Sequence, residues 1–255
     1  MSNRVRWAVV LTAVSILAAW WLPAMPQPLD YHDFADHREM LGVANFLDVA
    51  SNLGFLLAGI AGLAVALRPR TCFERASERV PYLLFFVGML LTAAGSAYYH
   101  LAPDNERLFW DRLPMTIAFM SLIAAQVQDR IGVRLGQALL IPMLLVGAAS
   151  VVSWRATERA GAGNVLPYGI LQGYSVLMLL LIAGLPSRYT RGGDLYAVFA
   201  AYVLAKILEY LDPEILGLGH VVSGHTLKHL AAAVGGGLVC RMLMLRSLRE
   251  APAPG

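Results

Sequence analysis

Long apolar runs alternate with short polar segments along the whole chain. Each run approaches the roughly 20 residues that a helix needs to cross a lipid bilayer. The runs cover residues 7–25, 45–67, 80–101, 107–127, 134–153, 165–185, 195–211 and 220–245. The pattern predicts an all-α protein, a polytopic membrane helix bundle in which every run is one span.

Composition agrees with this prediction. Hydrophobic residues make up 58% and charged residues 15% of the 255 residues, which excludes an ordinary soluble domain. The longest connection, about residues 24–44, is too short and too polar to fold as a separate domain. We expect an N-terminal transmembrane helix and linker at residues 1–30, a seven-helix domain at 31–245 and a cytoplasmic tail at 246–255.

The first run follows the basic segment MSNRVR, so it is either a cleaved secretory signal or a retained helix. We favour retention for two reasons. The run is longer than the roughly 7–15 apolar residues of a signal peptide, and the segment WLPAMPQP lacks a small-x-small cleavage site.

Arginine residues gather at alternate ends of the predicted spans. Because lysine and arginine resist translocation, we expect these loops and both termini in the cytoplasm. The basic start and the short loops are typical of a bacterial inner-membrane protein, so the more acidic opposite end is expected at the periplasm. The arginines at the cytoplasmic end are Arg4, Arg6, Arg68, Arg70, Arg75, Arg79, Arg130, Arg134, Arg188, Arg191, Arg241, Arg246 and Arg249.

The formal net charge of +3 is explained by these loops, and no basic patch with interleaved aromatic residues accompanies it. We therefore expect no nucleic-acid partner. Cys72 and Cys240 both fall on the reducing side of the membrane, so a structural disulfide is not expected either.

A pair of histidines, His225 and His229, lies four residues apart on one face of a predicted helix. A third histidine, His100, ends another span, and Ser96 precedes it by one helical turn. Asp111 lies in the next, antiparallel span, at about the same depth as Ser96 when helices rise 1.5 Å per residue. These five side chains are predicted to converge near the periplasmic end.

Each histidine taken singly could be a buried residue with one hydrogen-bond partner. Three at one membrane level favour a metal site, because ionisable groups inside a membrane are usually functional. Three neutral imidazoles and one open position describe catalytic zinc, which activates water and polarises a carbonyl. Imidazole also suits copper, nickel and iron. Haem is disfavoured, since the pair would crowd one side of the iron and the chain has no CxxCH.

At such a centre, Asp111 is expected to act as general base and then general acid in hydrolysis. The alternative for Asp111 is to orient a histidine. Ser96 is expected to donate a hydrogen bond to the developing oxyanion or to hold a ligand, and its alternative is a bond back to its own helix.

These residues resemble the alkaline ceramidase family, within a wider group of seven-helix membrane hydrolases and receptors that includes the adiponectin receptors. The resemblance spans about residues 31 to 245. Four segments carry it: Asn45-Phe46-Leu47-Asp48-Val49-Ala50-Ser51-Asn52, Ser96-Ala97-Tyr98-Tyr99-His100, Asp111-Arg112-Leu113-Pro114-Met115 and His225-Thr226-Leu227-Lys228-His229.

The resemblance implies a seven-helix ceramidase-like core preceded by one extra transmembrane helix. It also implies zinc held by His100, His225 and His229, with Asp111 as acid and base and Ser96 as oxyanion helper. The implied activity is hydrolysis of the amide of a ceramide-like N-acyl lipid, a membrane lipid substrate.

The family also has a calcium-binding segment before its first helix, ending in a glutamate where this chain has Asn45. Asp33, Asp36, Glu39 and Asn45 offer a weak calcium site. We favour solvated loop carboxylates over calcium.

Two other classes of function stay open at this point. A non-catalytic lipid receptor or regulator would keep zinc for structure, and such sites are usually closed by a fourth protein ligand. A transporter would use Lys206, Glu209 and Asp48 as its pathway and predicts flux without hydrolysis. Lys206 and Glu209 are three residues apart, and we expect a structural ion pair rather than a headgroup site.

Overall fold

The computed structural model describes residues 3–249, and in this range the chain is helical and contains no β-strand. The predicted all-α fold class is confirmed. The α-helices are α1 (Asn3–Trp21), α2 (Phe46–Ala50), α3 (Leu53–Leu67), α4 (Arg79–Leu101), α5 (Asn105–Arg130), α6 (Val133–Arg159), α7 (Leu166–Ala183), α8 (Asp194–Tyr210), α9 (Asp212–Gly219) and α10 (Gly224–Leu245). Two 3-10 turns are η1 (Leu29–His32) and η2 (Ala76–Glu78).

Seven helical segments among the described residues are long and apolar enough to cross a membrane. They are α1, α2 with α3, α4 with η2, α5, α6, α7 and α10. Helix α8, with 17 residues, occupies the remaining apolar run. The chain is therefore an integral membrane helix bundle, in which the N-terminal helix precedes a group of seven.

Several helix boundaries differ from the prediction. Helix α1 ends at Trp21 rather than at residue 25, because Pro23 follows and disfavours helical backbone at the residue before it. The last span begins at Gly224 rather than at residue 220, and Ser223 caps it by accepting a bond from the Thr226 N–H at 3.0 Å. Residues 212–219, predicted as a loop, form the short helix α9.

The second span is broken where a continuous helix was predicted. Helix α2 ends at Ala50 and α3 begins at Leu53. Both intervening side chains bond back to the Asp48 carbonyl, Ser51 Oγ at 2.9 Å and Asn52 Nδ2 at 2.8 Å. Such local side-chain bonds compete with the regular helix and bend it.

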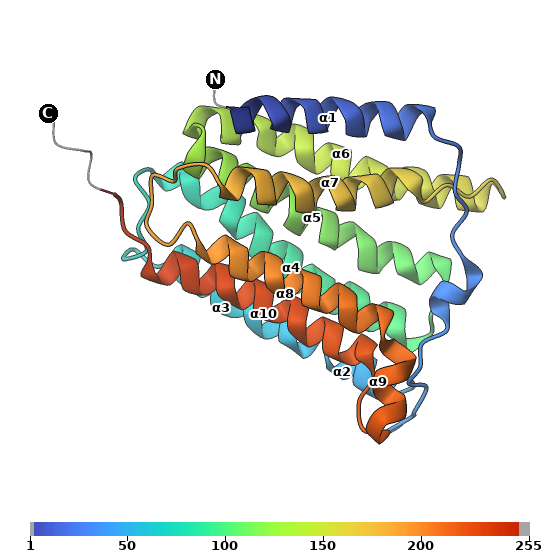
Figure 1. Ribbon diagram of the computed structural model, residues 1–255. Coiled ribbons are helices and arrows are strands. Elements are labelled where there is room, and N and C mark those ends of the chain that lie inside the picture. Colours follow the sequence, from blue (N-terminus) through green and yellow to red (C-terminus); the bar gives the residue numbers. More distant parts are fainter. Residues whose placement is uncertain (1–2, 250–255) are drawn as a thin grey trace, which may run out of the picture.

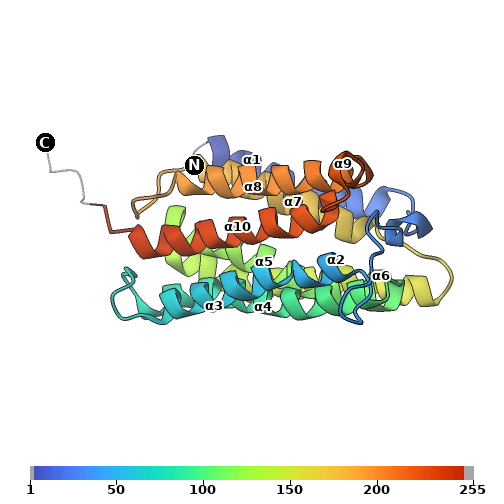
Figure 2. The ribbon, with the colours of Figure 1, turned by 90° about the horizontal axis from the view of Figure 1, so that it is seen from below.

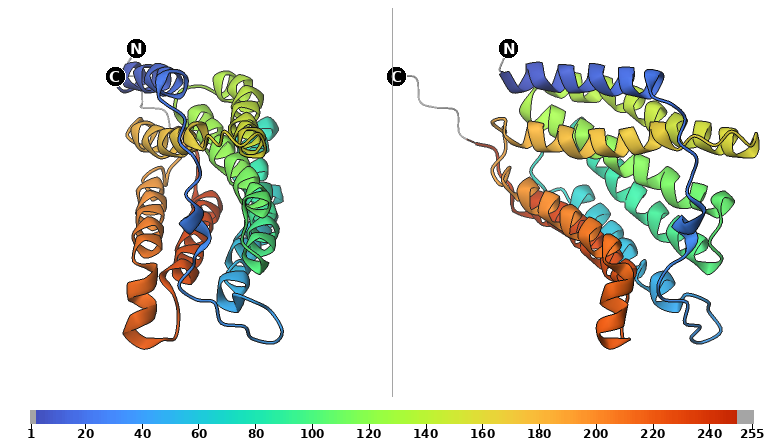
Figure 3. Two further views of the ribbon diagram at one scale, coloured as in Figure 1. Left: turned by 90° about the vertical axis from the view of Figure 1, so that its right-hand side faces the viewer. Right: turned by 45° about the vertical axis from the view of Figure 1, so that its right-hand side comes forward.

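The helices run back and forth along one common direction (Figure 1). Helix α10 lies between α8 on one side and α3 and α4 on the other, as the view from below shows (Figure 2). Helices α4 and α5 form a closely packed antiparallel pair. Helix α1 lies on the outside against α7 (Figure 3), and Thr12 and Tyr174 share a hydrogen bond of 3.3 Å there.

One glycine sets the distance between α4 and α5. A Cβ atom on Gly95 would collide with the backbone carbonyl of Trp110. Because glycine lacks that atom, the two backbones touch at this level. The neighbouring residues in sequence are Ser96 and Asp111, so this contact brings two predicted site residues together.

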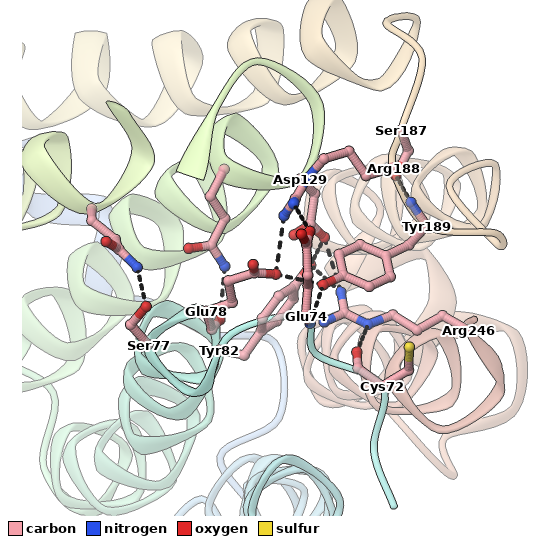
Figure 4. A network of polar contacts seen from close by, with 12 residues as sticks. Cys72, Glu74, Ser77, Glu78, Tyr82, Asp129, Ser187, Arg188, Tyr189 and Arg246 are labelled. Carbon is pink, nitrogen blue, oxygen red and sulfur yellow. Dashed lines mark hydrogen bonds and ion pairs between the residues drawn. The ribbon is translucent and has the colours of Figure 1, made fainter. Parts of the chain in front are cut away.

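A buried polar network closes one end of the bundle (Figure 4). Arg246 Nη1 donates to Asp129 Oδ2 at 2.9 Å, and the Tyr82 hydroxyl donates to the same oxygen at 2.6 Å. Arg246 Nε donates to the Cys72 carbonyl at 3.0 Å, and its guanidinium lies 4.0 Å from the ring centre of Tyr189. The network joins the α3–α4 connection, α4, α5, the α7–α8 connection and the end of α10.

We expect Arg246→Ala to lower the thermal stability of the protein in detergent strongly. Removing one partner of a buried ion pair typically costs about 3–5 kcal/mol, because the other charge is left uncompensated. Arg249→Ala removes an exposed arginine three residues later and serves as the control. Equal melting temperatures for the two variants would contradict this role of the network.

Candidate metal centre

Three histidines from two helices meet inside the bundle. His100 lies in the last turn of α4, and His225 and His229 lie in the first turns of α10. Their ring centres are 4.8 Å (His100–His225), 5.0 Å (His100–His229) and 4.9 Å (His225–His229) apart. All three residues are buried, and one ligand nitrogen from each lies within 4.8 Å of the others. The predicted convergence of the histidines is confirmed.

One of the three nitrogen–nitrogen distances fits a tetrahedral metal. His100 Nε2 and His225 Nε2 are 3.2 Å apart. Two nitrogens bound to one tetrahedral zinc at about 2.0–2.1 Å would be separated by about 3.3 Å. Within the described residues, the group holds no fourth histidine, cysteine or carboxylate. The donor set therefore suits an ion with one position left open.

Ser51 orients the third imidazole. Its hydroxyl has one proton and donates it to the Asp48 carbonyl at 2.9 Å. The 2.8 Å contact between Ser51 Oγ and His229 Nδ1 must then be donated by the histidine. This fixes the His229 tautomer with its Nε2 lone pair available to an ion. This role of Ser51 was not predicted from the sequence, although a polar Ser-Asn pair inside an apolar run was a signal.

Other polar residues hold the first turn of α10 in place. Asp212 Oδ1 accepts the His225 N–H at 2.6 Å, and Asp212 Oδ2 accepts the Ala35 N–H at 2.9 Å. Asp48 Oδ1 accepts the Thr226 hydroxyl at 2.6 Å. These bonds connect α10 to α2, to the start of α9 and to the connection that follows α1. Asp212 and Thr226 were not predicted as site residues.

The connection after α1 covers the histidines. The Phe34 ring is buried and lies 4.2 Å from the His225 ring centre and 4.7 Å from that of His100. Further along, Arg38 donates to the carbonyls of His220 at 2.7 Å and Val221 at 2.9 Å. Hydrogen bonds from Arg38 also hold the pKa of Asp36 below its ordinary value. The connection is thereby tied to the turn that precedes α10.

The four residues of the weak calcium prediction have other neighbours. Asp36 pairs with Arg38 at 2.6 Å, and exposed Asp33 contacts His37 at 3.2 Å. The Asn45 amide donates to the His100 carbonyl at 2.8 Å, so Asn45 supports a histidine. Glu39 is exposed. In the described part of the chain, carboxylates of this connection do not form a metal-binding group, and calcium stays a prediction.

Ser96 and Asp111 face each other across the α4–α5 contact, and their side chains interact. Both line a cavity of about 210 Å³ whose wall also includes His229. Most of the remaining wall is apolar, with side chains from α3, α4, α5, α7, α8 and α10. Through His229, the histidine group therefore adjoins a long apolar space at the level of the predicted acid and base.

Lys206 and Glu209 form the expected ion pair on α8. A third partner was not expected: Lys228 Nζ donates to Glu209 Oε1 at 2.7 Å. All three side chains line the cavity. Asp48, the third residue of the transporter alternative, is not among the lining residues and bonds to Thr226 instead.

Comparison of the chain with protein-family models and with curated proteins finds no match.

We expect purified protein to hold about one zinc ion per chain and His225→Ala to lose it, because two imidazoles hold zinc poorly. Ser51→Ala should keep the fold and weaken zinc binding about 10–100-fold, the usual effect of losing an orienting partner. Metal content by mass spectrometry and competition with a chelator measure both effects.

His37→Ala is the matched control, since His37 is exposed and lies outside the metal group. If Ser51→Ala protein binds zinc as tightly as the wild type, Ser51 does not support metal binding.

Proposed function

We propose that this chain is a zinc-dependent integral-membrane amide hydrolase acting on a ceramide-like N-acyl lipid. The observation that carries the proposal is the position of the three-histidine group, beside a long apolar cavity that Asp111 and Ser96 also line. An acyl chain is the natural occupant of such a space. The resemblance to alkaline ceramidases supports the same activity, because the four matching segments contain every one of these residues.

Zinc held by three imidazoles supplies a nucleophile from water near neutral pH and polarises a bound carbonyl. The open position favours a catalytic ion over the structural ion of a receptor, since structural sites are usually closed by four protein ligands. His100, His225 and His229 would hold the ion, and Ser51 would keep His229 in the required tautomer.

Asp111 would take the proton released by water and later give it to the leaving amine. In the free protein the Ser96 hydroxyl faces the Asp111 carboxylate. Once Asp111 is protonated it becomes a donor, so Ser96 can turn its own proton to the developing oxyanion. Ser96 would thus orient the base at the start of the reaction and stabilise negative charge later.

We propose in addition that the chain lies in a bacterial inner membrane with both termini in the cytoplasm. Helix α1 begins and α10 ends at one end of the bundle, together with the α3–α4, α5–α6 and α7–α8 connections (Figure 1). These are the arginine-rich segments, and the positive-inside rule assigns them to the cytoplasm. The histidines would then lie near the periplasmic side.

For the reaction, we expect Asp111→Asn to keep its zinc and lose at least about 100-fold in turnover. Ser96→Ala should lose about 100-fold or more, as when an oxyanion donor is removed. Release of fatty acid from a fluorescent ceramide and from other N-acyl lipids, beside metal content, gives the two readouts.

Ser150→Ala is the control, because this buried hydroxyl on α6 bonds back to Gly147 and does not line the cavity. Zinc-loaded protein that releases no fatty acid from any of these lipids would favour the receptor. Metal-free wild-type protein after growth with adequate zinc would contradict the centre itself.

For the orientation, we expect Glu39→Cys in intact cells to react with a membrane-impermeant thiol reagent from outside. Cys72, at the opposite end, should react only after the membrane is opened. The reverse labelling pattern would show that the protein has the opposite orientation in the membrane.

A further inference from the structure

The connection between α1 and α2 crosses the end of the bundle at which the histidines lie (Figure 1). It places one buried apolar side chain, Phe34, against the rings of His100 and His225. Of the three histidines only His229 belongs to the wall of the apolar cavity. Phe34 therefore covers the two histidines that the cavity does not reach.

Hydrogen bonds just before this ring fasten the connection to α4 and α5. Asn105 Oδ1 accepts a bond from His32 Nε2 at 3.0 Å, since the amide nitrogen of Asn105 donates to a neighbouring glutamate. His32 Nδ1 is then the acceptor for the Tyr99 hydroxyl at 2.8 Å. Because Tyr99 directly precedes His100, this bond attaches the connection beside one histidine of the group.

A buried arginine holds the neighbouring Tyr31. The Arg112 guanidinium lies 5.1 Å from the ring centre of Tyr31, 4.5 Å from that of Trp154 and 4.9 Å from that of Tyr168. A cation is attracted to the face of an aromatic ring, and more strongly where water is excluded. Through this one side chain the connection is also attached to α5, α6 and α7.

The residues after Phe34 are fastened to the start of α10. The Ala35 N–H and the His225 N–H share one carboxylate, that of Asp212, whose two oxygens accept them at 2.9 Å and 2.6 Å. Arg38 donates to two carbonyls of the turn before α10. Phe34 thus lies between attachments to both helices that carry the histidines, and its position is fixed relative to each.

We propose that residues 31–38 form a cap over the metal centre, in which Phe34 is a positioning residue. Its ring keeps the imidazoles of His100 and His225 in place and keeps water beyond this end of the bundle away from them. Apolar groups around a metal control the access of solvent to it. An ion would enter or leave on this side only when the cap opens, so its exchange rate follows the population of the open form.

The test is the release of zinc from loaded, purified protein to an excess of EDTA. We expect Phe34→Ala to release zinc at least about tenfold faster than the wild type, because it uncovers two of the imidazoles. Phe109→Ala is the matched control. Phe109 has the same exposed fraction of 6% and belongs to the same apolar cluster, but its ring contacts Trp110 and the Arg155 guanidinium. Loss of packing alone would affect both variants alike.

Arg38→Lys loosens the cap while Phe34 stays in place. Lysine keeps a positive charge beside Asp36 but lacks the planar fork with which Arg38 reaches this carboxylate and two carbonyls at once. We expect release at least about threefold faster than from the wild type, as for the loss of a hydrogen bond. Melting temperatures of the same samples show which variants are folded.

Faster release from Phe34→Ala than from Phe109→Ala supports the cap even if no lipid is hydrolysed, which would defeat only the proposed function. Release from folded Phe34→Ala that equals that of Phe109→Ala or of the wild type overturns the cap and leaves the hydrolase standing. If Phe34→Ala does not fold, release from Arg38→Lys at the wild-type rate overturns it instead. Wild-type protein that takes up no zinc overturns the cap together with the metal centre.

Discussion

The first turn of α10 is the part of the molecule on which the site depends. A helix start inside a membrane protein exposes backbone N–H groups that water cannot satisfy, so the protein must supply acceptors. Asp212 and Ser223 do so, and Asp48 holds the Thr226 hydroxyl one residue after His225. His225 lies on this turn and His229 on the next, so two of the three candidate metal ligands follow directly from this helix start. The polar contacts that make the helix start possible therefore also fix the direction of the imidazoles.

A second constraint comes from the contact of α4 with α5. At Gly95 the two backbones touch, and the next residue on each side faces the cavity as Ser96 or Asp111. The same helix α4 then presents His100 one turn later. The α4–α5 pair thus positions Asp111, Ser96 and His100. His225 and His229 come from α10. The histidine group is shared between α4 and α10, and the hydrogen bond between His229 and Ser51 connects it to the break between α2 and α3.

Most of the fold could be predicted from the sequence, because each span is a local pattern of apolar residues. The convergence of the three histidines could also be predicted, since helix direction and depth follow from counting residues. The contacts of Ser51 with His229, of Asp48 with Thr226 and of Asp212 with Ala35 could not. Each joins residues more than 170 positions apart and depends on how the helices rotate against each other. The break at Ser51 and Asn52 was hidden because the apolar run continues through it.

Lys228 illustrates what packing adds to a sequence pattern. By spacing alone, Lys206 and Glu209 explain each other on α8, and Lys228 has no partner. Packing of α10 against α8 brings Lys228 to the same carboxylate, and Asp111 lies in the same cavity wall, so two lysines and two carboxylates are gathered beside a mostly apolar space. In such surroundings charges interact far more strongly than in water, so these four groups stabilise one another. The cavity therefore has one charged end beside His229, and most of the rest of its wall is apolar.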